Sequence, residues 1–219
     1  MTIDTLIDKQ DTFEIVRDSI AQILADEVAA QQVLATAAGK DATLWDMGVY
    51  TERFNPWEMM RDQPSAVPVV HVWYDRSNFQ MGASNVVEKQ QVDASYNIDL
   101  IARGTAEDIV GAGHVPGDKD AIFNVQRAAR LTRNILMADL YTYLGLRGTV
   151  GRRWISSIES FQPDQGEHGT PRVAGMRISL SVIFNEFSPQ YTPEILEGVS
   201  VSIQRDIDGK VLAKMEFPE

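Results

Sequence analysis

The sequence predicts an α+β fold in which a mostly antiparallel β-sheet is flanked by two long α-helices and followed by a C-terminal β-hairpin. Two segments, residues 11–38 and 119–144, repeat apolar side chains at helical spacing. Residues 94–102 and 176–184 alternate apolar and polar side chains, as antiparallel strands with one buried and one wet face do. An Asp-Gly pair at 208–209 separates two further strand-like segments and indicates a hairpin turn.

The composition is that of a globular protein with an acidic balance. The 219 residues include 20 Lys and Arg against 31 Asp and Glu, which gives a net charge of −11. General nucleic-acid binding needs a basic surface, so this charge argues against it. The absence of cysteine excludes disulfides, Cys-based metal sites and a thiol nucleophile. The acidic start resembles no signal peptide and no apolar stretch reaches ~18 residues, so we expect a soluble protein folded in the cytoplasm where it is made.

The first helix is expected at residues 11–38. Asp11 and Glu14 have the spacing of a capping box at its start, and Gly39 is placed to end it. Its apolar stripe consists of Phe13, Val16, Ile20 and Leu24. The stripe weakens further along, so the pattern predicts an amphipathic helix lying on a sheet.

Strands are expected before and after the second helix, where β-branched and aromatic residues concentrate between polar turn segments. In chain order they are residues 49–51, 67–75, 93–102, 152–161, 172–187 and the two segments around the Asp-Gly pair. A brief helix capped by Asn55, with Pro56 at its first position, is expected after the first of these strands.

The second helix, residues 119–144, is predicted to be apolar on two sides. Its main stripe consists of Ile122, Val125, Ala129, Thr132, Leu136, Leu140 and Tyr143, and Gly145 is placed to end it. Leu131 and Ile135 lie off that stripe. A helix that is apolar on two sides usually contacts two partners. We expect one to be its own sheet and the other to be a neighbouring subunit, or an arm from one.

Arginines form the last candidate cluster. They recur every third residue on the second helix and continue after its end, at Arg127, Arg130, Arg133, Arg147, Arg152 and Arg153. Two interpretations stay open, a solvated face or an edge that meets an acidic face of a neighbouring subunit. The candidate subunit-interface residues are therefore Arg127, Arg130, Leu131, Arg133 and Ile135.

A glycine-rich loop, residues 111–120, precedes the second helix. A dinucleotide-binding loop has the spacing G-x-G-x-x-G, whereas the glycines here stand at 111, 113 and 117, one residue too long. A P-loop needs Lys and Ser or Thr after its last glycine, where this chain has Asp118. Asp118 and Asp120 would also repel a phosphate. We interpret the loop as a hinge and expect no nucleotide or other cofactor.

The sequence predicts no catalytic set and no metal site. His71, His114 and His168 are scattered and lack metal-ligand spacing. The acids around residue 208 echo the start of a calcium loop, but a hairpin turn explains them. We therefore expect a protein that is not an enzyme. A small α+β hydrolase or lyase that uses His114 or His168 stays open as an alternative.

The element order resembles that of tail terminator proteins, also called tail completion or neck proteins, of tailed bacteriophages. The segments that carry the resemblance are VYTERFNPWE, VPVVHVWYD, RAARLTRNILMADLYTYLG and EFSPQYTPEILEGVSVSIQRD. The resemblance covers nearly the whole chain and rests on element order rather than on a short motif. It implies one domain over residues 1–219, with residues 1–10 as a flexible arm.

That resemblance implies a structural virion protein without catalysis. Such proteins form a ring, usually of six subunits, on the last ring of the tail tube, stop its polymerisation and join it to the head connector. The expected partners are further copies of itself, the tube protein and the connector, in the virion neck and, during assembly, in the host cytoplasm. DNA would pass through without specific binding, which suits an acidic chain. The alternatives are a connector adaptor, a tube protein or, further off, a host oligomeric scaffold.

Overall fold

The computed structural model places the chain in two compact units, residues 8–187, here called the body, and a C-terminal unit. It describes residues 8–52, 67–80, 89–110, 113–161, 173–187, 199–204 and 211–217, the last two ranges by their backbone alone. The sequence analysis expects one domain over residues 1–219, and the two units are described separately below. The Asn55 helix, His168 and the Asp-Gly pair lie outside the described residues.

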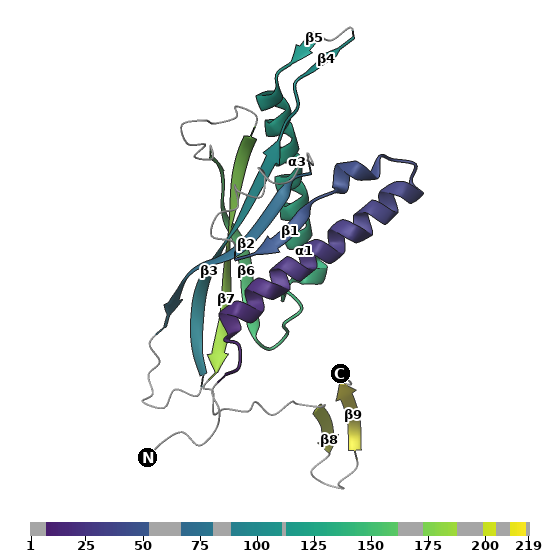
Figure 1. The fold of residues 1–219 in the computed structure, drawn as a ribbon. Helices are drawn as coiled ribbons and strands as arrows, with labels where there is room; N and C mark the ends of the chain where they lie inside the picture. The colour runs from purple at the N-terminus through teal and green to yellow at the C-terminus, as the bar shows by residue number, and fades with distance from the viewer. Residues whose placement is uncertain are drawn as a thin grey trace. The chain divides into compact units, whose positions relative to one another are not determined.

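The body is built on a five-stranded sheet with the strand order β1-β2-β3-β7-β6 (Figure 1). The strands are β1 (Gly48–Thr51), β2 (Val69–Phe79), β3 (Lys89–Arg103), β6 (Val150–Phe161) and β7 (Val173–Phe187). β1 pairs with β2 in parallel, and every other pair of this sheet is antiparallel. The predicted α+β class with a mostly antiparallel sheet is confirmed. Two register shifts interrupt the pairing of β6 with β7, one on each side of Arg153.

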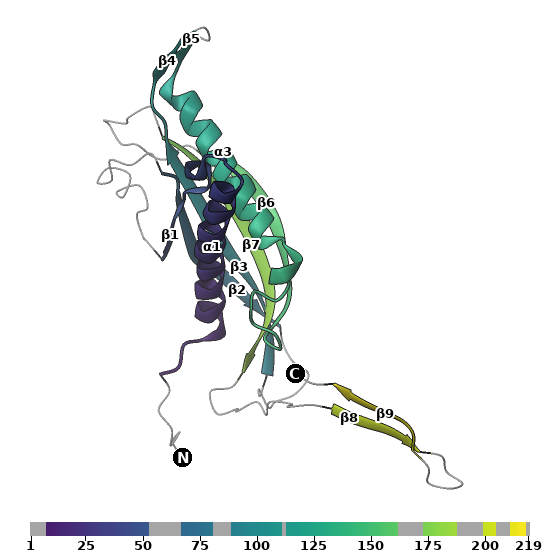
Figure 2. The same ribbon diagram turned by 90° about the vertical axis from the view of Figure 1, so that its right-hand side faces the viewer.

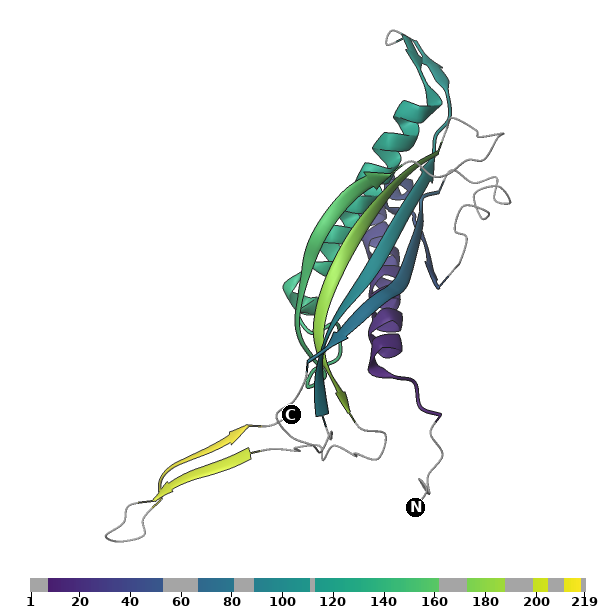
Figure 3. The same cartoon turned by 90° about the vertical axis from the view of Figure 1, so that its left-hand side faces the viewer.

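Two helices, α1 (Thr12–Ala37) and α3 (Gly117–Leu136), pack on the same face of this sheet, as the opposite views in Figures 2 and 3 show. The face that they cover is apolar because one set of alternate β3 side chains points to it. These side chains are Val92, Ala94, Tyr96, Ile98, Leu100 and Ala102, all buried. They form one core cluster with the apolar stripes of both helices.

α1 follows the prediction closely. The backbone N–H of Asp11 donates to the Glu14 carboxylate at 3.0 Å, which is half of the expected capping box. Gly39 ends the helix with a φ of +67°, a conformation that favours glycine. In its stripe, Val16, Ile20 and Leu24 are fully buried and Phe13 is partly buried. The N–H and hydroxyl of Thr12 also donate to the Glu186 carboxylate of β7, which fixes the start of α1 to the sheet.

α3 is shorter than predicted. It ends at Leu136, and a 3-10 turn, η2 (Asp139–Tyr141), follows. The Arg153 guanidinium of β6 donates to the carbonyls of Ala138 and Tyr141 at 2.8 and 2.6 Å, so a distant strand satisfies the carbonyls where the chain leaves the helix. The predicted stripe is correspondingly shorter. Its buried members are Val125, Ala129, Thr132 and Leu136, whereas Ile122, Leu140 and Tyr143 are exposed.

The glycine-rich loop before α3 is part of a β-hairpin, so the predicted hinge is wrong. β4 (Glu107–Ile109) and β5 (Gly113–Val115) pair antiparallel and project beyond the N-terminal end of α3 (Figure 1). Backbone hydrogen bonds between the two strands restrict the backbone rotation that a hinge needs. We call β4 and β5, together with Val110, the β4–β5 arm.

The root of the β4–β5 arm is held against α3. A Cβ added to Gly104 would lie 1.9 Å from the Gly117 carbonyl oxygen and 2.3 Å from the Ala121 nitrogen, so only glycine permits this approach. The Thr105 N–H donates to the Asp120 carboxylate at 3.0 Å. The acids at the start of α3 therefore accept a hydrogen bond from the same chain and interact favourably with the helix dipole.

The C-terminal unit contains β8 (Val199–Gln204) and β9 (Val211–Phe217), which pair antiparallel. The turn that the sequence predicts at the Asp-Gly pair lies outside the described residues.

Replacing Gly104 by Ala should lower the free energy of unfolding by about 2 kcal/mol or more, because the new methyl group overlaps backbone atoms that cannot move independently. Urea unfolding followed by tryptophan fluorescence measures the change. Gly151→Ala is the matched control, since the nearest atom to its added Cβ lies at an ordinary 3.7 Å. Equal stability of the two variants would contradict the tight packing at the arm's root.

Candidate self-assembly surface

Opposite sides of the body carry opposite charge. Residues 8–52, which form α1, the 3-10 turn η1 (Ala42–Trp45) and β1, contain nine acidic and three basic residues. Residues 117–161, which form α3, η2 and β6, contain four acidic and seven basic residues. β1 and β6 are the two edge strands of the sheet, α1 contacts β1 and β2, and α3 contacts β3 and β7. We call the two regions the acidic side and the basic side.

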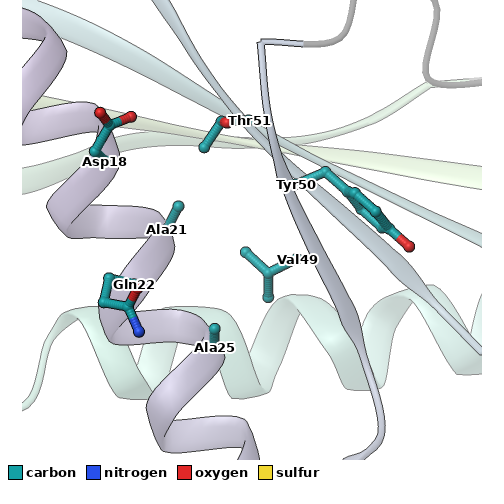
Figure 4. Close-up of a pocket in the computed structure, with 7 residues that line it drawn as sticks. All are labelled: Asp18, Ala21, Gln22, Ala25, Val49, Tyr50 and Thr51. Atoms are coloured by element: carbon teal, nitrogen blue, oxygen red, sulfur yellow. The ribbon is translucent and has the colours of Figure 1, made fainter.

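The acidic side contains a groove of 480 Å³ between α1 and β1 (Figure 4). It is lined by Asp18, Ala21, Gln22, Ala25, Val49, Tyr50 and Thr51. Ala21 and Ala25 stand one helical turn apart, and their small side chains leave the space open. Arg17 forms salt bridges with both Asp18 and Glu52, at 2.8 and 3.2 Å. Its single positive charge balances one of the two carboxylates, so these three side chains keep a net charge of about −1.

A second, smaller hollow of 250 Å³ lies between α1 and the C-terminal half of α3. Its apolar walls come from Val28, Trp45, Leu131, Ile135, Leu140 and Tyr141, and its rim from Glu27, Gln31, Asn134 and Ala138. The Tyr141 hydroxyl donates to the Glu27 carboxylate, which ties η2 to α1 across this hollow. That hydrogen bond raises the pKa of Tyr141 to about 12. We call this feature the α1–α3 hollow.

The two apolar interface candidates both lie at this hollow. Ile135 is only 9% exposed and belongs to the body's core cluster. The second apolar side of α3 is therefore covered first by α1 of the same chain, which the sequence analysis did not consider. Leu131 is partly buried against the same core and lines the hollow, so part of it stays accessible to a partner.

The three candidate arginines of α3 do not form one row. A step of three residues turns 300° around a helix, so Arg127, Arg130 and Arg133 drift across about 120° of its surface. Arg127 donates to Asn124 at 3.0 Å and lies close enough to Asp41 of η1 to help lower the pKa of that carboxyl, although hydrogen bonds from Thr43 contribute more. Arg130 and Arg133 are exposed.

The arginines after α3 have separate roles. Arg153 is committed to the carbonyls at the end of the helix, and its burial lowers its pKa. Arg152 lies over the Trp154 ring at 5.3 Å and is exposed, as is Arg147. The arginines of the basic side that are exposed are therefore Arg130, Arg133, Arg147 and Arg152.

The sequence predicts that the polar side chains of residues 93–102 face solvent, but on the sheet face opposite the helices one of them, Asp99, is buried. Asp99 is 3% exposed and accepts two hydrogen bonds from Arg177 of β7, at 2.6 and 2.9 Å, and one from the Trp73 indole at 3.0 Å. The guanidinium lies over the Trp73 ring at 5.2 Å and the Phe161 ring at 5.6 Å. The hydrogen bond to Asp99 raises the pKa of Arg177. We call this set the Asp99–Arg177 cluster.

The two described histidines, His71 and His114, have separate environments. His71 is buried on β2 and stacks on Tyr50 with ring centroids 5.6 Å apart. His114 contacts the exposed Asp108 across the β4–β5 arm at 2.8 Å. Within the described ranges, no three His, Asp or Glu side chains gather as a metal-binding group. No helix in that part of the chain has the length and apolar character needed to cross a membrane.

No protein-family model matches this chain, and no curated protein sequence does. The charges, the grooves and the β4–β5 arm described above are therefore the features that bear on function.

Replacing Arg177 by Met should lower the free energy of unfolding by about 3 kcal/mol, because it leaves the buried Asp99 carboxylate without its cation. Asp99→Asn should cost about 1 kcal/mol, since the Arg177 side chain is 37% exposed and water can solvate it. Urea unfolding of both variants and of the double variant tests this. If Arg177→Met matched the parent within error, the cluster would carry no stability.

Proposed function

We propose that this protein is a structural subunit that joins head to tail with copies of itself into a ring. The observation that carries the proposal is the opposite charge of the acidic and basic sides, which lie toward opposite edges of one sheet. A contact between two unlike surfaces of identical subunits closes into a ring when the rotation permits. Charge complementarity also favours the correct orientation and raises the rate of encounter.

We propose further that the ring is a tail terminator in the neck of a tailed phage, a cap on the tail tube that stops its growth and receives the head connector. The support for this step is the element order and the resemblance stated above. The two helices on the sheet, the β4–β5 arm and the C-terminal β8–β9 hairpin are the parts that such a ring would use for its contacts. Six subunits is the expected number.

The acidic balance of the chain also supports a channel for DNA. Each phosphate that a fixed Lys or Arg neutralises releases counterions and strengthens non-specific binding, which would retard a moving duplex. A ring that places its arginines at subunit boundaries and its remaining acids at the channel avoids this. The basic side then faces the neighbouring subunit rather than the DNA.

Reversing two charges of the basic side, Arg133→Glu with Arg152→Glu, should weaken self-association about tenfold or more, since two attractive contacts become repulsive. Native mass spectrometry at several concentrations measures the ring population. Arg76→Glu on β2 makes the same kind of change at another exposed position and is the control. Unchanged assembly of the double variant would contradict the charge-based contact, and long tubes from the parent protein would favour a tube protein.

Duplex DNA should bind the purified ring negligibly at near-physiological salt, about 0.15 M, because the subunit carries a net charge of −11. Fluorescence anisotropy of a labelled duplex is the measurement, repeated at lower salt. Tight binding that falls steeply with salt would overturn the channel and indicate a protein that holds DNA.

A further inference from the structure

We propose that the β4–β5 arm of one copy inserts Val110 into the α1–α3 hollow of a neighbouring copy. The inference rests on the proposed self-assembly and names the contact that would direct it. The observation to be explained is that the same chain carries an arm with a fully exposed valine and a hollow with apolar walls.

The arm carries an apolar residue that its own chain leaves in water. Val110, which follows β4, is fully exposed. A two-stranded hairpin is marginally stable by itself and gains from a surface that covers it. The arm's root is nevertheless rigid, because Gly104 and Thr105 hold it against α3. A rigid arm loses little conformational entropy when it docks.

The hollow offers a surface of matching character. Leu131 and Tyr141 form part of its apolar wall, and Leu140 at its edge is 78% exposed. Covering these side chains and Val110 together removes apolar surface from water on both partners. The Tyr141–Glu27 hydrogen bond holds the walls in place before a partner arrives.

Charges around the two elements are complementary. The arm presents Glu107 and Asp108, and Asp108 has a side chain that is 89% exposed. On α3, Arg127 precedes Leu131 by four residues and so lies one turn away on the same face of the helix, beside the hollow. An arm that enters the hollow would bring its acids toward this arginine.

The arm cannot fill the hollow of its own chain. α3 begins beside the arm's root at Gly117, and Leu131 lies about 21 Å further along the helix axis at 1.5 Å per residue. Each arm strand has three residues and spans about 10 Å. Figure 1 shows that the arm extends in the opposite direction, away from α3. An arm that fills the hollow must therefore belong to a second copy.

Cysteine cross-linking tests this contact directly, because the chain has no cysteine of its own. The variant Val110→Cys with Leu140→Cys should form covalent dimers and higher species on mild oxidation, since a disulfide requires Cα atoms closer than about 7 Å. Denaturing gels without reductant measure these species. Val110→Cys with Phe79→Cys is the control, because Phe79 is 57% exposed on β2 and lies outside the hollow.

A charge exchange between the two contact partners provides a second, independent test. Asp108→Arg and Arg127→Glu should each reduce self-association about tenfold in native mass spectrometry, and the double variant should recover at least half of the ring population. Asp108 is exposed and Arg127 is half-buried at the surface, so the melting temperature should stay close to that of the parent.

The outcomes separate this contact from the proposed function. Rings that form without the 110–140 cross-link, or with only a 110–110 cross-link, would overturn the arm contact and leave the ring intact. A parent protein that stays monomeric at all concentrations and forms no cross-link would overturn both. A cross-linked ladder together with rescue by the charge exchange would support both.

Discussion

The helix-facing side chains of β3 are the constraint on which the body depends. β3 pairs along its length with β7 and along most of it with β2, so it occupies the centre of the sheet. Its buried alternate side chains meet the stripes of both helices in one cluster. Because a shift of one residue would turn this set of side chains to the other face, the register of β3 determines which face the helices can cover. The positions of α1, α3 and the charged sides follow from it.

Both faces of β3 contribute to the stability of the body, each in a different way. The helix-covered face supplies the apolar core, and the opposite face holds the Asp99–Arg177 cluster, where burial is matched by hydrogen bonds. Within the described residues of the body, the surfaces most suited to contacts are the acidic side, the basic side, the α1–α3 hollow and the β4–β5 arm.

Local patterns predicted the parts of the fold that local physics determines. The stripe of α1, its capping residues and the alternation of β3 and β7 were readable because spacing alone places those side chains. The end of α3 was not, because Arg153 of β6 binds the carbonyls of Ala138 and Tyr141, which follow the helix, and no local pattern indicates this contact. The buried state of Asp99 likewise depends on the register that brings Arg177 opposite to it. The arginine spacing suggested an interface but could not show that three-residue steps spread these side chains around the helix.

The two register shifts in β6 have a consequence for how copies of this chain meet at the sheet edge. An edge strand of twelve residues presents a row of backbone donors and acceptors that another sheet could extend. Each irregularity bends the strand and breaks the even spacing of that row, so a second molecule cannot pair along its whole length. Such an edge lowers the tendency of crowded copies to stack into β-aggregates. Any association of copies is then left to side-chain surfaces, whose electrostatic attraction weakens as salt rises.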